Sequence, residues 1–270
     1  MPGTEEIESA GVSRRGFVTR MGTAAIGTAA AALVVGCGGG NGSAKAAGNM
    51  DQSILNAAAT AEALATVMYY NIIHLSGSIY QTGPLSSNAP DKAYLVAGYE
   101  QELNHYNFLV AHGGVALATT FYFPTNMFTD PQTTVNTLVT LEDAFIAAYL
   151  IGVRDFSSTA LKVIAGQIMG VEAEHRTLAR VITNDLGLSA VSGLAGSEQV
   201  GAPGYTANNL AYERTFSTAL PDISHVVGAL GPYVTPGTAG FSATAFPFST
   251  ANAAAPSAGQ TPVTLAGTTP

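Results

Sequence analysis

The chain has 270 residues, a formal net charge of −8 and only 10% charged residues. Its ten lysines and arginines form no basic patch, which argues against a nucleic-acid partner. A single cysteine, Cys37, excludes an intrachain disulfide.

The first 36 residues have the pattern of an export signal. Arg14 and Arg15 lie in the motif SRRGFV, which is typical of twin-arginine signals, and an uncharged apolar run follows from Met21 to Gly36. This run is shorter than the roughly 20 residues that a membrane span needs. It ends in VVGC, which resembles a lipoprotein box, so Cys37 is the predicted lipidation site; the alternative is an ordinary signal-region cysteine. We expect export by the twin-arginine route to the periplasm or cell envelope, with a lipid anchor.

Composition divides the rest of the chain into four parts. Residues 37–49 are rich in glycine and alanine and predict a flexible linker. Residues 50–188 predict a compact domain. Residues 189–234 predict an extension that includes a short helix at 222–233, and residues 235–270 form a Thr/Ala/Pro-rich tail, which we expect to be disordered or draped over the domain.

Apolar residues recur at helical spacing in four segments of the compact domain, which predicts an all-α bundle. The predicted helices begin at Asp51, at Pro90, at Pro131 after the capping residue Asp130, and after Ser158. They end near residues 77, 113, 156 and 186. The gap at 114–129 is longer than a tight turn and predicts one long crossover between the second and third helices.

Each predicted helix carries acidic residues inside its apolar stripe, where a buried carboxylate is costly unless it has a partner. Two helices carry a lone glutamate and two carry an E-x-x-H motif, in which both side chains lie on one helix face. Only eight glutamates follow the signal, and half of them occupy these positions. The residues concerned are Glu62, Glu102, His105, Glu142, Glu172 and His175.

This pattern predicts a two-metal site. Glu102 and Glu172 are the expected bridges, Glu62 and Glu142 the expected terminal ligands, and four carboxylates would offset two divalent cations. Oxygen and imidazole ligands without sulfur favour iron or manganese. The alternative is a set of buried salt-bridged carboxylates, but these helix faces offer few basic partners.

With these motifs the chain resembles the ferritin-like superfamily, and specifically the exported ferritin-like domain family that includes desiccation-related proteins. The resemblance covers residues 50–188 and all six ligand positions, and the later segments YER (212–214) and DISHVVGALGPYV (222–234) resemble that family's C-terminal extension. It implies a ferritin-like four-helix bundle with a di-iron or di-manganese centre. It implies no single reaction, because members include oxidases, peroxidases, catalases, storage cages and proteins of unknown activity.

Three functions are compatible with the predicted two-metal site and the family resemblance. The first is a metal-dependent redox protein that reacts with oxygen or peroxide as a ferroxidase, peroxidase or catalase. The second is a stress-related or desiccation-related structural protein in which any metal only stabilises the bundle. The third, an iron-storage cage subunit, fits poorly with a lipid anchor and a long extension. The expected partners are metal ions and oxygen or peroxide, with membrane contact only through the anchor; a homo-oligomer is compatible with the sequence.

Four other side chains near the motifs have two interpretations each. His112 lies two turns after His105 and is interpreted as a helix-end residue rather than an auxiliary ligand. Tyr69 and Tyr149 each follow a lone glutamate by seven residues; we interpret them as core packing, with a redox or ligand-supporting role as the alternative. Arg176 adjoins a ligand in sequence but faces about 100° away from it, so a role in supporting that ligand is compatible with the sequence but not established by it.

Overall fold

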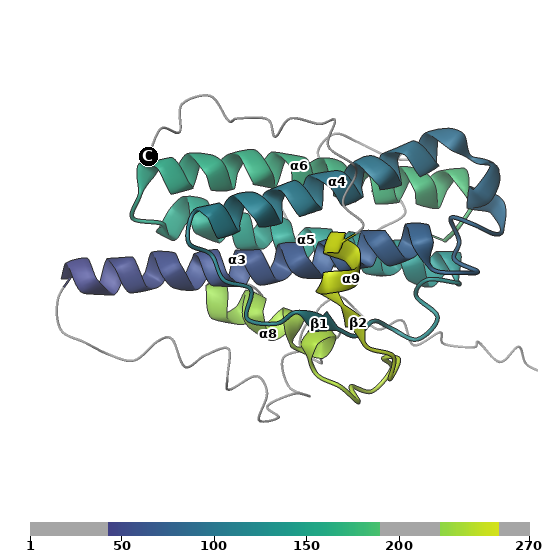
Figure 1. The fold of residues 1–270 in the computed structure, drawn as a ribbon. Helices are drawn as coiled ribbons and strands as arrows, with labels where there is room; N and C mark the ends of the chain where they lie inside the picture. The colour runs from purple at the N-terminus through teal and green to yellow at the C-terminus, as the bar shows by residue number, and fades with distance from the viewer. Residues whose placement is uncertain (1–42, 190–221, 254–270) are drawn as a thin grey trace, which may run out of the picture.

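The computed structural model describes residues 43–189 and 222–253. Its main body is a bundle of four long helices, α3 (Ser43–His74), α4 (Ala89–Ala111), α5 (Pro131–Asp155) and α6 (Thr159–Asp185). Helices α3 and α4 form one packed pair and α5 and α6 form the other (Figure 1). The predicted bundle with one long crossover is confirmed. The predicted signal and its Cys37 lie outside the described residues.

Local capping explains where the helices begin. The side chain of Asp130 accepts a hydrogen bond from the backbone N–H of Thr133 at 2.8 Å, and Pro131 occupies the first turn. Ser158 caps α6, and Asn88 caps α4 by accepting from the N–H of Asp91. These starts agree with the sequence-based prediction to within one residue.

The predicted start of the first helix at Asp51 is wrong. Helix α3 begins at Ser43, so residues 43–49, predicted as flexible linker, are helical. The segment SAKAAG includes three alanines and a lysine, which are strong helix formers and outweigh its single glycine. Asp51 instead accepts hydrogen bonds from the backbone N–H and the hydroxyl of Ser157, at 2.7 and 2.5 Å. It thereby fastens the turn between α5 and α6 to α3.

The crossover at 112–130 and the C-terminal part of the chain pack on each other. Strand β1 (Thr120–Phe121) pairs antiparallel with β2 (Phe246–Pro247), a contact that the sequence analysis did not predict (Figure 1). Phe123 in the crossover contacts the rings of Phe128, Tyr233 and Phe246. The crossover is therefore held by aromatic packing rather than left as a free loop.

The extension covers the bundle. Helix α8 (Ile223–Val234) is the predicted short helix, and the side chain of Asp222 caps it. Helix α9 (Phe248–Ala253) packs on α3, and the hydroxyl of Tyr99 donates to the carbonyl of Ala251 at 2.7 Å. For residues 235–253, the tail is draped over the bundle, one of its two predicted states.

Helix α5 is long and apolar enough to cross a membrane by length and composition, but 78% of its most apolar window is buried within the protein. It packs chiefly against α6. This burial is what a core helix of the bundle requires.

Gly98 allows α4 to approach Tyr69 of α3, and its replacement is expected to destabilise the fold. A Cβ at Gly98 would lie 2.9 Å from Cε1 of the Tyr69 ring, which is fully buried. We predict that Gly98→Ala lowers the free energy of unfolding by about 1–3 kcal/mol, measured by urea denaturation. The control is Gly170→Ala in α6, where a Cβ meets nothing within 4 Å; it should be neutral or stabilise by up to about 1 kcal/mol. Equal effects of the two substitutions would contradict the role assigned to Gly98.

Candidate metal centre

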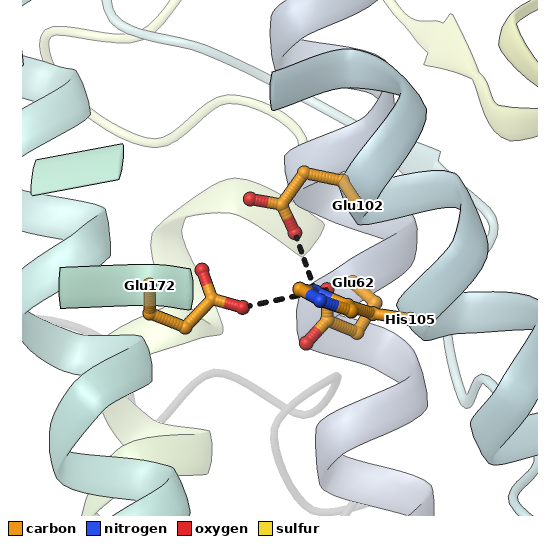
Figure 2. A group of neighbouring side chains, drawn as sticks. All are labelled: Glu62, Glu102, His105 and Glu172. Atoms are coloured by element: carbon orange, nitrogen blue, oxygen red, sulfur yellow. Dashed lines mark ion pairs between the residues drawn. The ribbon is translucent and has the colours of Figure 1, made fainter. Parts of the chain in front are cut away.

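The structure brings the six predicted residues together in the middle of the bundle. Helix α3 supplies Glu62, α4 supplies Glu102 and His105, α5 supplies Glu142, and α6 supplies the remaining pair (Figure 2 shows four of the six). All four glutamates are buried, each with 1% or less of its surface exposed. The apolar stripe of each helix therefore buries its acidic residue in the core, as the sequence predicted.

The first half of the cluster is centred on Nδ1 of His105. This atom lies 3.1 Å from Oε1 of Glu172, 3.4 Å from Oε2 of Glu62 and 3.8 Å from Oε2 of Glu102. The four residues each offer one ligand atom, and these atoms lie within 4.8 Å of one another. Such spacing is compatible with one shared cation.

The second half is centred on Nδ1 of His175. This atom lies 2.8 Å from Oε1 of Glu102, 3.3 Å from Oε2 of Glu172 and 4.0 Å from Oε2 of Glu142. Glu102 and Glu172 therefore belong to both halves, and each turns one carboxylate oxygen toward each histidine. Two carboxylates that bridged a pair of cations would have this arrangement.

Two tyrosines hold the outer carboxylates. The hydroxyl of Tyr69, on α3, donates to Oε1 of Glu142 on α5 at 2.8 Å. The hydroxyl of Tyr149, on α5, donates to Oε1 of Glu62 on α3. Interpretation of these tyrosines as core packing alone is thus incomplete, because both also orient a carboxylate. In each glutamate the second oxygen, Oε2, is the one that faces a histidine.

Gln101 orients His175 and was not identified from the sequence. Its Oε1 lies 2.8 Å from Nε2 of His175, and an amide oxygen can only accept, so Nε2 carries the hydrogen. In the neutral ring, Nδ1 then has a free lone pair directed at the carboxylates. Gln101 lies beside the apolar stripe of α4, and a single glutamine there has no periodic signal that could reveal it.

The charges of the cluster shift its ionisation. Burial, together with the nearby carboxylates, raises the pKa of Glu62 and of Glu142 well above the usual value. For Glu102, burial raises the pKa, but the charge of His175 and the neighbouring side chains of His105 and Glu62 outweigh it and lower the pKa overall. Burial alone would lower the pKa of His105 and His175, yet the surrounding carboxylates raise it well above the usual value. Without a metal the cluster therefore retains protons.

The orphaned acceptors of this cluster fit bound cations. Several buried atoms make no hydrogen bond within the described residues, and leaving a buried acceptor unpaired is costly. These atoms are Oε2 of Glu62, both oxygens of Glu102, Oε2 of Glu142, Oε1 of Glu172 and Nδ1 of His105. These six atoms, which are part of a longer set of such atoms in the described residues, face the centre of the cluster, so the donor set suits a carboxylate-rich metal site.

Two other interpretations are settled by contacts outside the cluster. His112 is exposed at the end of α4, where its Nδ1 lies 2.8 Å from the carbonyl oxygen of Phe108, so it is a helix-end residue. Arg176 donates from Nη1 to Oδ1 of Asp143 at 2.8 Å. This ion pair joins α6 to α5 beside the cluster.

Comparison with known proteins agrees with this geometry. A family model described as a ferritin-like domain matches residues 50–185, slightly more than half of the chain. The chain belongs to the ferritin-like domain family. The match spans all six cluster residues and confirms the superfamily that the motifs indicated, while membership of the desiccation-related family stays a prediction. No curated protein and no solved structure matches the chain.

Metal removal should make the stability of this ferritin-like domain depend on pH. Groups whose pKa is raised by folding, here Glu62, Glu142, His105 and His175, contribute stability at low pH that is lost as pH rises through their folded pKa. Glu102 acts oppositely, but because its pKa is lowered, that effect is confined to pH values below the usual glutamate pKa of 4.5. The melting temperature of metal-free protein should therefore decrease as the pH rises from about 5 to about 8.

Metal-loaded protein should show a smaller fall and melt at least about 5 °C higher at about pH 8. Differential scanning calorimetry of both forms across this range makes the measurement. Equal melting temperatures with and without metal would contradict the assignment of these residues as ligands.

Proposed function

We propose that this protein is an exported di-metal redox protein of the cell envelope that binds two iron or manganese ions and reacts with molecular oxygen or peroxide. The observation that carries the proposal is the set of buried carboxylate oxygens that make no hydrogen bond and converge around two histidine Nδ1 atoms. The proposed ligands are Glu62, Glu102, His105, Glu142, Glu172 and His175.

The two halves of the cluster assign a role to each ligand. Glu102 and Glu172 would bridge the two ions, because each offers one oxygen to each half. Glu62 with His105 would complete one ion, and Glu142 with His175 the other. Four carboxylates would balance two divalent cations, so the buried site would approach neutrality.

Iron or manganese bound here would supply electron transfer to oxygen or peroxide. The chain's own residues prepare the site for that chemistry. The hydroxyls of Tyr69 and Tyr149 fix the terminal carboxylates, and burial raises the pKa of both phenols well above the usual value, so they remain donors. Gln101 holds His175 with Nδ1 toward the centre. Oxidation of Fe(II), peroxide reduction and peroxide dismutation are the reactions that such a site supports.

Export and anchoring are the second part of the proposal. The twin-arginine motif at Arg14 and Arg15 and the VVGC sequence before the linker support transport to the envelope and lipidation of Cys37. The twin-arginine route carries folded proteins, so a metal centre could be assembled before export.

Loss of a proposed ligand should remove metal. We predict about two metal ions per chain in wild type and fewer than about one in Glu102→Ala or His175→Ala, measured by elemental analysis of purified protein. Fe(II) oxidation and peroxide turnover should fall with metal content, at least about tenfold. The control is Glu174→Ala, an exposed glutamate on the same helix as Glu172.

Wild-type metal content and rates in both ligand variants would show that the ligands are wrongly assigned. Folded, stable wild-type protein without metal would instead favour a structural protein on the same bundle.

Loss of Cys37 should release the protein from the membrane. A single acyl attachment point is removed by Cys37→Ser, so the variant should move from the membrane fraction to the soluble fraction of fractionated cells. A separate Arg14→Lys, Arg15→Lys variant should stop export and leave the chain in the cytoplasm. An unchanged distribution of Cys37→Ser would contradict lipidation.

A further inference from the structure

An apolar cavity lies inside the bundle near the cluster. It is bounded by the first half of α3, the beginning of α6, the ends of α4 and α5, and the first residue of α8, Ile223. It admits the centre of a water-sized sphere over about 10 Å³, which is the room for one very small molecule. Three of its lining residues are alanines, Ala58, Ala148 and Ala165, and their short side chains leave this space open.

The cavity lies about one turn from the cluster on α3 and α4, and about two turns from it on α5 and α6. Ala58 precedes Glu62 by one turn on α3, and Leu109 follows His105 by one turn on α4. Tyr149 makes the direct connection: its ring lines the cavity and its hydroxyl donates to Glu62. A molecule in the cavity would thus be separated from the cluster by one tyrosine.

The edge of the cavity is formed by two residues of different elements. Leu161, in the first turn of α6, and Ile223, at the start of α8, are half-buried, whereas the other lining residues are buried. An entrance from solvent is therefore expected between the starts of α6 and α8.

The lining selects the occupant by polarity. Apart from Tyr149, every lining side chain is aliphatic or phenyl, and the hydroxyl of Tyr149 is used by Glu62. A water molecule needs two to four polar partners, which this lining does not supply, and small apolar cavities of this kind stay dry. Hydrogen peroxide also needs polar partners. A small apolar molecule needs none and can occupy the cavity.

We propose that this cavity is a binding site for molecular oxygen, which enters between Leu161 and Ile223 and reaches the cluster past Tyr149. Binding to the cavity stands on the lining alone. Delivery rests on the proposed function and deepens it, because it makes oxygen rather than peroxide the molecule that the fold admits from this side.

Binding is tested on metal-free protein with oxygen itself as the probe. Oxygen is paramagnetic, so it speeds the NMR relaxation of methyl groups that it contacts. Under oxygen, the methyl groups of Ile54 and Ile164 at the cavity should relax several-fold faster than those of Ile72 and Ile182, which are equally buried elsewhere in the core. Equal enhancement at the four isoleucines would overturn the proposal.

A filled cavity provides the second measurement. Ala58→Met should remove the excess relaxation at Ile54 and Ile164, because a flexible methionine can occupy the space. Ala97→Met, which adds the same side chain at an exposed site of α4, should leave the excess unchanged. Persistence of the excess in folded Ala58→Met protein would overturn the assignment to this cavity.

Delivery is tested by comparing two oxidants on Fe(II)-loaded protein. Ala58→Met should slow oxidation by oxygen several-fold and leave oxidation by peroxide unchanged, since peroxide does not use an apolar route. Equal slowing with both oxidants, or none with oxygen, would overturn delivery. A chain that binds no metal would refute the proposed function and delivery together, while the methyl relaxation would still decide oxygen binding.

Discussion

The burial of four glutamates at the centre of one bundle is the constraint on which the rest of the structure depends. A carboxylate in a dry interior is unstable unless opposite charge or hydrogen-bond donors compensate it. Here two histidines lie between the carboxylates, and two tyrosines donate to the outer pair. Compensation is still incomplete, because buried oxygens without donors are left at the centre. Two cations would supply the missing charge. Metal binding is therefore expected to raise the stability of this fold.

The compensation links the two halves of the bundle. The α3–α4 pair and the α5–α6 pair each contribute one lone glutamate, one E-x-x-H motif and one tyrosine. Each tyrosine serves the other pair's glutamate: Tyr69 on α3 holds Glu142, and Tyr149 on α5 holds Glu62. The tyrosine hydrogen bond to each terminal carboxylate therefore comes from the other pair, so the complete site requires that the pairs dock. The crossover between them is fixed by β1, β2 and the rings around Phe123, which gives the docking a defined geometry.

The sequence was sufficient for what depends on periodicity and helix-end chemistry. The four helices, three of their starts and all six cluster residues follow from apolar stripes, capping residues and the rarity of glutamate. It was insufficient where a contact joins distant segments. The hydrogen bond from Tyr149 to Glu62 joins residues 87 positions apart, and the one between His175 and Gln101 joins residues 74 positions apart. Neither contact leaves a local pattern in the sequence. The early start of α3 was missed because glycine-rich surroundings obscured a short run of good helix formers.

Burial also determines from which side ions, protons and small molecules can reach the cluster from solvent. Of the six cluster residues, His105 has the most exposed side chain, at 13%, so the polar contact with water is on the α4 side. Ions and protons need hydration or polar partners along their route, and His105 is where the cluster offers them. The apolar cavity beside Tyr149 offers none, and Ile223, the first residue of α8, forms part of its edge. On the proposed route for oxygen, the fold would separate a polar approach from an apolar one, and the C-terminal extension would take part in the second through Ile223.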